Sequence, residues 1–458
     1  MVSHKLIKLI LFSLLFFLII NIVFEYGKFV PYYEKNIVNT LTLSDKPFLK
    51  DISIFYDLSI ALIFFLFIFN LLKKIPNFKN TIHLQILWVI KCFISFFLII
   101  ILENNFGKDQ YSYFGILINN DSYNVVFGDL TKILDKNYPT ANFLIPLKLI
   151  NFIFSDSWFM QKLFQNILYI SSLILFLKII EIIENNLSNN IFLIYFIGLI
   201  PSFIFFSSFI TKDLLVIFLI SLTTYSFLSL GKKLKKNVQY LILIIFSISY
   251  IFLLRNWVAY TLIISIFLFY LLNLLKILNF SFIHVILFSI IIFFIYTDSF
   301  HLLLNEISIS MFDRFKMEHF FPKQDYETLF INKGERLEVL LMYPKALYKT
   351  LFNPFILDIK NVKYFIFILE NFILFLLLLN SFYFLKKNLN LKIFFIFCIF
   401  FILVTVYTPI GYLNTGTTIR YILAPKLLFF IFLILINKDL FNGIDNKLRN
   451  LFFTRKRS

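Results

Sequence analysis

Long runs of hydrophobic residues dominate the chain, and short polar segments separate them. Most runs are close to the length of about 20 residues that an α-helix needs to cross the hydrocarbon core of a bilayer. The pattern therefore predicts an all-α, polytopic transmembrane helical bundle of about 12 spans. We place the spans near Leu6–Val23, Ile52–Leu72, Ile82–Leu102, Trp158–Lys178, Ile191–Ser208, Leu214–Leu230, Val238–Leu254, Val258–Leu275, Phe282–Tyr296, Tyr364–Leu385, Ile393–Tyr407 and Tyr421–Ile436.

Composition supports a membrane protein over a soluble one. The chain is 60% hydrophobic and 15% charged, whereas soluble domains are about 45–50% apolar and about 25% charged. Cys92 and Cys398 both lie inside apolar runs, so we expect buried thiols rather than a disulfide framework or a metal site.

The net charge of +17 is explained by membrane orientation, and no nucleic-acid motif is visible. Lysines and arginines collect after the second, sixth and tenth runs and in a basic tail at 437–458. The positive-inside rule assigns these segments, and both termini, to the cytoplasm. The residue bias is that of an AT-rich bacterial genome, so we expect a multi-pass protein of the bacterial plasma membrane.

Two large extracytoplasmic segments, 103–156 and 297–363, follow from this orientation. Loops of this length are usually functional or disordered. Amphipathic, aromatic stretches such as Leu147–Phe154 predict interfacial helices that lie along the membrane surface. We see no internal repeat, so residues 1–458 are predicted to form a single polytopic membrane domain.

Arginine is rare in this lysine-rich chain, and its positions are informative. Arg255, Arg314, Arg336 and Arg420 all map to the outer face. Guanidinium forks make bidentate contacts with phosphates that lysine cannot match. Arg255 and Arg420, at the ends of predicted spans, are the stronger candidates for phosphate binding. The alternative is interfacial snorkelling or a loop salt bridge.

The segment PSFIFFSSFITKD, Pro201–Asp213, is a second candidate. Pro201 interrupts the fifth run, and Lys212 and Asp213 stand at the start of the next helix. Such a pair can receive an anionic group or hold a substrate hydroxyl. An ordinary turn with Asp213 near a helix N-terminus would look similar.

The outer loops supply further candidates. In NNDSYNVVFGDL, Asp121 is a possible general base toward a sugar hydroxyl, with a solvated loop acid as the alternative. In LNTGTTIRYILAP, Asn414 and Thr417 precede a helix start that can cradle an anion. No metal-ligand spacing is visible, so we expect no metal or other cofactor.

Charged residues inside apolar runs are expensive and need partners. We expect Glu370, next to Asn371, to face the bundle interior and to pair with a lysine or arginine, for structural or functional reasons. For Lys91 in the third run we favour snorkelling to the interface.

The chain resembles bacterial O-antigen and exopolysaccharide polymerases and lipid-linked-sugar transferases of the glycosyltransferase-C superfamily, over about residues 110–430. The features that carry the resemblance are Asp121–Tyr123, Pro201–Asp213, Arg255, Leu351–Phe355, Glu370–Asn371 and Asn414–Tyr421. It implies an undecaprenyl-linked sugar or oligosaccharide donor whose diphosphate is bound by outward arginines, and an acid that activates the acceptor. One difference is that the superfamily's acidic motif usually lies in the first outer loop, whereas Asp121 lies in the second.

Our preferred interpretation is glycosyl transfer or polymerisation at the outer membrane face, with a polyprenyl-linked donor and a saccharide acceptor. Asp121 or Asp213 would be the base. The predicted substrate-binding residues are Arg255, Arg420, Lys212, Glu370, Asn414 and Thr417. The alternatives are a transporter or flippase that uses Glu370 and Lys91 in a central path, and a non-catalytic scaffold.

Overall fold

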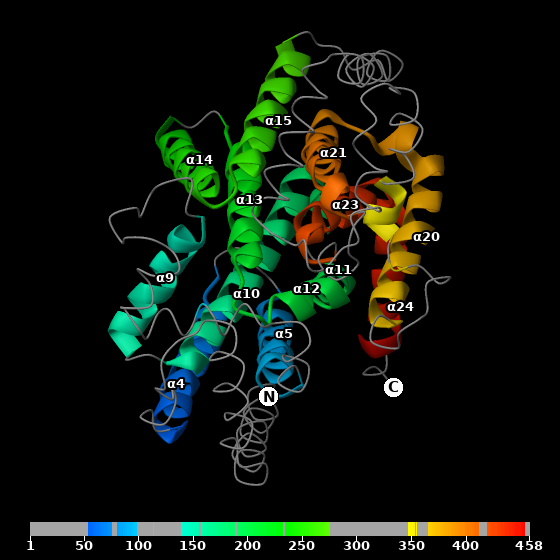
Figure 1. The fold of residues 1–458 in the computed structure, drawn as a ribbon. Coiled ribbons are helices and arrows are strands. Elements are labelled where there is room, and N and C mark those ends of the chain that lie inside the picture. The colour runs from blue at the N-terminus through cyan, green and yellow to red at the C-terminus, as the bar shows by residue number, and fades with distance from the viewer. Residues whose placement is uncertain are drawn as a thin grey trace, which may run out of the picture. The chain divides into compact units, whose positions relative to one another are not determined.

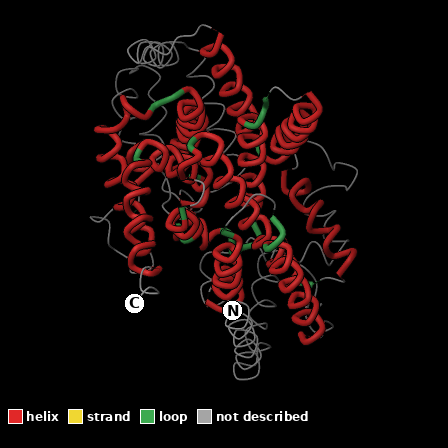
Figure 2. Tube along the Cα trace, turned by 180° about the vertical axis from the view of Figure 1, so that it is seen from behind, coloured by secondary structure: helices red, strands yellow, loops and turns green. Residues whose placement is uncertain are grey.

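The computed structural model describes eleven stretches of the chain, which are mainly helical with short loops between the helices (Figure 2). They are residues 54–75, 80–98, 113, 139–154, 157–187, 190–231, 234–274, 347–352, 354, 365–411 and 419–453. The predicted spans Leu6–Val23 and Phe282–Tyr296 lie outside them. The chain divides into unit 1, Met1–Ala259 with Asp439–Ser458, and unit 2, Tyr260–Lys438. Each unit is described by itself.

Unit 1 is organised around one long helix, α10 (Trp158–Ile183), which is labelled in Figure 1. Ser157 begins this helix, because its hydroxyl accepts a hydrogen bond from the Met160 N–H at 3.0 Å. The helix packs against α4, α5, α9, α11 and α13, and α14 packs against α13 and α9. The other described elements of unit 1 are α4 (Ile54–Leu72), α5 (Thr81–Phe93), the π-helix η1 (Ile94–Leu98), α9 (Pro139–Phe154), the 3₁₀ turn η3 (Asn185–Leu187), α11 (Ile191–Gly198), α12 (Pro201–Phe206), α13 (Lys212–Leu228), α14 (Leu234–Leu254), the start of α15 (Asn256–Leu274) and nearly all of α24 (Lys438–Phe453).

The predicted fifth run, Ile191–Ser208, is two short helices rather than one span. α11 ends at Gly198, and Pro201 begins α12 at its first position, where a missing N–H costs no hydrogen bond. A Cβ on Gly198 would lie 2.7 Å from Cδ1 of Leu87. The absence of a side chain therefore lets α11 approach α5 closely.

The C-terminal helix α24 docks on the start of α11. The Asp445 carboxylate accepts hydrogen bonds from the N–H groups of Ile191 and Phe192, at 2.9 and 3.2 Å. Asn190 donates to the Phe441 carbonyl at 3.1 Å, and its own side chain begins α11. The sequence analysis predicted only a basic tail at 437–458, so this helix is an addition.

The described part of unit 2 contains the rest of α15, a short helical stretch at 347–352, α20 (Phe365–Asn388), α21 (Leu391–Gly411) and α23 (Leu423–Ile436). α23 packs against both α20 and α21. Phe400 of α21 stacks on Phe429 of α23, with ring centroids 4.3 Å apart. Asn390 turns the chain between α20 and α21 by accepting from the Ile393 N–H at 2.9 Å.

Within the described residues, five helices are long and apolar enough to cross a membrane. They are Phe159–Ile183, Asn237–Leu254, Asn256–Asn273, Phe365–Asn388 and Leu391–Thr408. A further pair, Leu423–Ile436 with Lys438–Leu448, is bent by 81°. The second and third predicted runs form shorter apolar helices, Ser59–Leu72 and Thr81–Phe96. The count of about 12 spans therefore stays a prediction.

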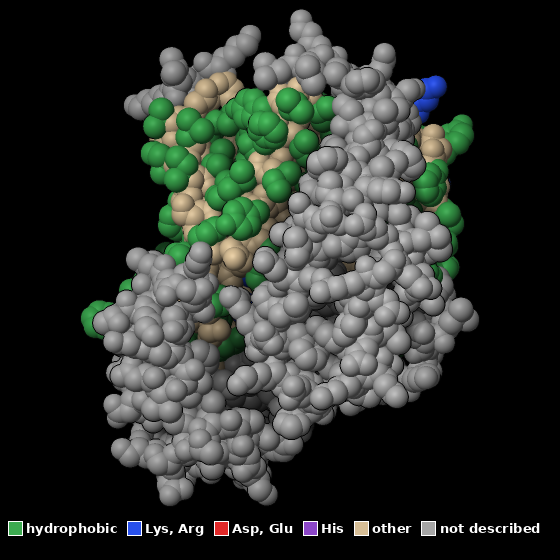
Figure 3. All heavy atoms as spheres, turned by 45° about the horizontal axis from the view of Figure 1, so that its top comes forward, with side chains coloured by type: hydrophobic (Ala, Val, Ile, Leu, Met, Phe, Trp, Pro, Cys, Tyr) green, Lys and Arg blue, Asp and Glu red, His purple; other side chains and the backbone are tan. Residues whose placement is uncertain are grey.

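Large apolar side chains cover the outer surfaces of these helices. Phe246 of α14, Phe267 of α15 and Tyr383 of α20 are mainly exposed. In the view of Figure 3, the described side chains are mostly hydrophobic, with basic groups only at one edge. Exposed apolar surface of this kind suits contact with lipid. The chain is a helical membrane protein.

One predicted interfacial stretch, Leu147–Phe154, is helical and forms the second half of α9. Its residues Leu149, Phe152 and Ile153 are exposed, whereas Leu147 is buried. This half of α9 therefore buries one face within unit 1 and exposes the other. Its position along a membrane surface stays a prediction.

Candidate functional site

Two residues that the sequence analysis singled out, Asp213 and Arg255, form a buried ion pair in unit 1. Asp213 lies in the first turn of α13. Arg255 lies between α14 and α15, where its N–H donates to the Ile251 carbonyl at 2.7 Å and its carbonyl accepts from the Val258 N–H at 3.0 Å. Nη2 of Arg255 donates to Oδ1 of Asp213, and the side chains are only 4% and 3% exposed.

The local structure fixes this pair in position. α13 packs against α14, and this packing brings the N-terminus of α13 to the α14–α15 junction. The N-terminus of a helix favours the negative charge of Asp213. Removing one partner of a buried pair costs about 3–5 kcal/mol, because the other charge is left uncompensated. The ion pair therefore holds the guanidinium of Arg255 in a fixed position.

Neighbouring polar groups complete this region. Thr211 begins α13 and is buried, and within the described part of the chain its hydroxyl has no hydrogen-bond partner. Lys212 is partly buried next to it. The sequence analysis named Lys212 but missed Thr211. A threonine directly before the charged pair of a helix start was the available signal.

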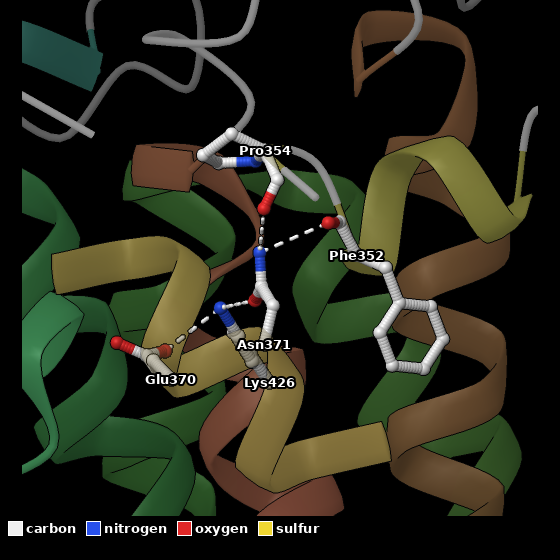
Figure 4. Close-up of polar contacts among 5 residues, drawn as sticks. All are labelled: Phe352, Pro354, Glu370, Asn371 and Lys426. Carbon is white, nitrogen blue, oxygen red and sulfur yellow. Dashed lines mark hydrogen bonds and ion pairs between the residues drawn. The ribbon is translucent and has the colours of Figure 1, made fainter. Parts of the chain in front are cut away.

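Unit 2 contains a second buried cluster, which Figure 4 shows. Lys426, in the first turn of α23, places its ammonium 2.7 Å from Oε1 of Glu370 and donates to Oδ1 of Asn371 at 2.5 Å. Nδ2 of Asn371 donates to the carbonyls of Phe352 and Pro354, at 3.0 and 2.8 Å. Glu370, Asn371 and Lys426 thus tie α20, α23 and the segment around Phe352 together.

The expected pairing of Glu370 with a basic residue is confirmed, because Lys426 provides the charge. Its predicted part in substrate binding stays a prediction. The sequence analysis missed Lys426 because lysine is so common in this chain that a single one carries little information. Its place inside an otherwise apolar run was the signal that could have found it.

The interpretation of Lys91 as a snorkelling residue is wrong. Lys91 is only 1% exposed, and its ammonium donates to Ser95 at 3.0 Å, to the Ile204 carbonyl at 2.9 Å and to Ser208. The reason is that α10, α11 and α12 surround this part of α5. The cluster includes Ser95 of the π-helix η1, a type of turn frequently found at functional sites.

Several predicted residues are not brought together by the structure. Asp121, Asn414 and Thr417 lie outside the described residues. Arg420 is partly buried in the helical turn before α23 and belongs to unit 2, whereas Arg255 belongs to unit 1. A pocket that both arginines share stays a prediction.

Among the described residues, no group of histidine, cysteine or acidic side chains has the arrangement of a metal site. Cys92 and Cys398 are free and buried.

No protein family, curated protein or solved structure matches the chain. The class that the fold defines is therefore a helical membrane protein with buried charged clusters in each of its two units. Its function has to be argued from those clusters.

Proposed function

We propose that the chain is a membrane-embedded enzyme of surface polysaccharide assembly. It would transfer or polymerise sugars from a polyprenyl-phosphate-linked donor at the extracytoplasmic face of a bacterial plasma membrane. The observation that supports this most is the buried guanidinium of Arg255, held by Asp213 at the start of α13.

A glycosyl transfer of this type releases a phosphate or diphosphate whose charge develops in the transition state. Fixed donors at that position lower the barrier, because they need no reorganisation during the reaction. Arg255 is such a donor, since Asp213 engages one end of its fork and positions the rest. Lys212 and Arg420 are proposed as additional cations, and Glu370, Asn414 and Thr417 as sugar or phosphate contacts.

The base that activates the acceptor hydroxyl is either Asp121 or Asp213. Because the carboxylate of Asp213 is engaged by Arg255, we favour Asp121 for this step and a positioning role for Asp213. In the overall reaction, the acceptor oxygen would bond to the anomeric carbon, the carbon–oxygen bond to the phosphate would break, and the base would take the hydroxyl proton. No metal is required by this scheme.

A transporter or flippase of polysaccharide precursors is the second candidate function. The buried position of Lys91 and of Glu370 within helices favours it, since intramembrane charges often mark a substrate path. A non-catalytic scaffold would not require particular charged residues at the positions of Lys91 and Glu370.

The test is complementation of a strain that lacks the gene, with surface polysaccharide chain length as the readout. We expect Arg255→Lys to reduce transfer by roughly 100- to 1,000-fold, as for loss of one charge-stabilising donor. Arg449→Lys, the same substitution in the C-terminal segment, is the matched control and should complement fully. The amount of protein in the membrane is measured for each variant.

A charge swap separates catalysis from structure. The double variant Asp213→Arg with Arg255→Asp keeps an ion pair but moves the guanidinium to α13. We expect it to accumulate in membranes and yet fail to make polysaccharide. Full rescue by the swap, or by Arg255→Lys, would refute phosphate binding by Arg255. Transport is tested separately, by movement of the lipid-linked precursor across proteoliposomes without any sugar transfer.

A further inference from the structure

Unit 1 contains a second polar cluster that the proposed reaction does not use. It lies between α5 with η1 on one side and α10 with α12 on the other. The Ser95 hydroxyl donates to Oδ1 of Asn166 at 2.7 Å and lies 3.0 Å from the Ser208 hydroxyl, and Asn166 also contacts Cys92. The ammonium of Lys91 lies among these groups and 5.2 Å from the ring centroid of Tyr169.

Next to this cluster, which Asn166 contacts, α10 is unusually polar for an apolar helix. Gln161, Lys162, Gln165 and Asn166 follow one another over two turns, and all four are fully buried. Residues four apart lie on the same side of a helix, so the glutamines form one stripe and Lys162 with Asn166 form the next.

Several amide atoms in this stripe need hydrogen bonds. Nε2 of Gln161 donates to Asn151 at 2.5 Å, but its Oε1 has no partner within the described part of the chain. Neither Oε1 nor Nε2 of Gln165 has one either. Leaving a buried amide unsatisfied costs about 1–3 kcal/mol per group. The stripe therefore has both donor and acceptor capacity for a bound molecule.

The cluster also carries positive charge that the described residues do not neutralise at Lys91. Only neutral oxygens accept from its ammonium, and Lys162 lies one turn before Asn166 on the same side of α10. A buried charge is costly unless it meets an opposite one. An anion close to Lys91 would provide it.

We propose that this cluster binds a polyhydroxylated anion, such as a sugar phosphate or a sugar acid. Its negative group would lie near Lys91 and Lys162 and accept from Nε2 of Gln165. Its hydroxyls would donate to the Oε1 atoms of Gln161 and Gln165. The proposal does not depend on glycosyl transfer, because none of these residues belongs to the Asp213–Arg255 region.

The experiment is isothermal titration calorimetry of the full-length chain in lipid nanodiscs. Four probes separate the chemistry: glucose 1-phosphate, glucuronate, inorganic phosphate and methyl glucoside. We expect glucose 1-phosphate, glucuronate or both to bind, inorganic phosphate to bind at least tenfold more weakly and methyl glucoside least. Which of the two sugar anions binds more tightly distinguishes a phosphate from a carboxylate ligand.

Variants locate the binding. Lys91→Met and Gln165→Leu should each weaken binding about 10- to 100-fold, as loss of one charged or charge-assisted contact predicts. Gln165→Leu replaces an amide that lacks hydrogen bonds with an apolar side chain of similar volume, so this variant should remain folded. A loss of binding in it can then be assigned to the missing amide. Lys386→Met is the matched control, because Lys386 is exposed at the end of α20, and it should bind normally.

Sugar-anion binding that Lys91→Met weakens but Arg255→Lys retains belongs to this cluster, whereas binding that only Arg255→Lys weakens belongs to the proposed transferase site. The failure of one proposal can therefore be told from the failure of the other. The proposal is overturned if no sugar anion binds, if methyl glucoside binds as well as the tighter of the two sugar anions, or if Gln165→Leu and Lys386→Met behave alike. If no sugar anion binds, water is the partner of the Gln161 and Gln165 amides.

Discussion

Lys91 and Lys426 are both 1% exposed and both lie within apolar helices, yet their surroundings differ. Lys426 meets the Glu370 carboxylate at 2.7 Å, so its cluster is neutral as it stands. Lys91 donates to hydroxyls and to one backbone carbonyl, so its charge is uncompensated by the described residues. The difference separates a cluster that holds helices together from one that is ready for an anionic ligand.

The largest effect should come from breaking the neutral cluster. Glu370→Gln removes the carboxylate and leaves Lys426 buried without its opposite charge. We expect a loss of about 3–5 kcal/mol in the free energy of unfolding, measured by reversible unfolding in detergent. The double variant Glu370→Leu with Lys426→Met removes both charges and should be much closer to wild type. Equal losses in the single and double variants would contradict an ion-pair role.

Overpacking next to the Lys91 cluster should give the next largest loss of stability. In Gly198→Ala the new methyl group would meet Cδ1 of Leu87 at 2.7 Å. Overpacking of this kind costs about 1–3 kcal/mol. Because Tyr169 donates its hydroxyl to the Gly198 carbonyl and its ring faces Lys91, probe binding should also weaken. Gly443→Ala, where a Cβ meets no atom within 4 Å, is the control.

A smaller effect is expected where α24 docks. Asp445→Ala removes the acceptor for the Ile191 and Phe192 N–H groups, which should cost about 0.5–2 kcal/mol, as for other lost N-terminal caps. Asp445→Asn keeps an acceptor and should cost less. Asp439 is exposed at the start of α24, so a smaller loss from Asp445→Ala than from Asp439→Ala would rule out the cap.

The smallest change in stability should come from Lys91→Met. This substitution removes an uncompensated charge and leaves the Ser95–Asn166 and Ser208–Ile204 hydrogen bonds in place. We expect the free energy of unfolding to change by less than about 1 kcal/mol, while binding of the sugar anion falls. A loss as large as that of Glu370→Gln would show that the two lysines play the same structural part.

Parts of the fold were predictable because they follow from hydropathy and helix chemistry. The apolar runs gave helices, Pro201 interrupted the fifth run, and the cost of burying Glu370 predicted a basic partner. Which lysine that partner is could not be predicted, since it depends on how α20 and α23 pack. The same limit applies to Asp213 and Arg255, which are distant in sequence and meet only through the packing of α13 against α14.

The sequence analysis was least informative where a residue type is common or a segment is polar. The abundance of lysine concealed Lys426 and led to the wrong interpretation of Lys91. The residues of α24 alternate charged and apolar types and were assigned only to a tail. Their helix is stabilised by Phe441 and Asp445 contacts with α11, which no local pattern reveals.

The docking of α24 also has a consequence for biosynthesis. Unit 1 is assembled from two separate stretches, and all of unit 2 lies between them in the chain. A ribosome therefore completes unit 2 before it supplies the residues that cap α11. Until then the first N–H groups of α11 lack their acceptor in Asp445, so a nascent chain halted before residue 445 should be an early target for membrane quality control.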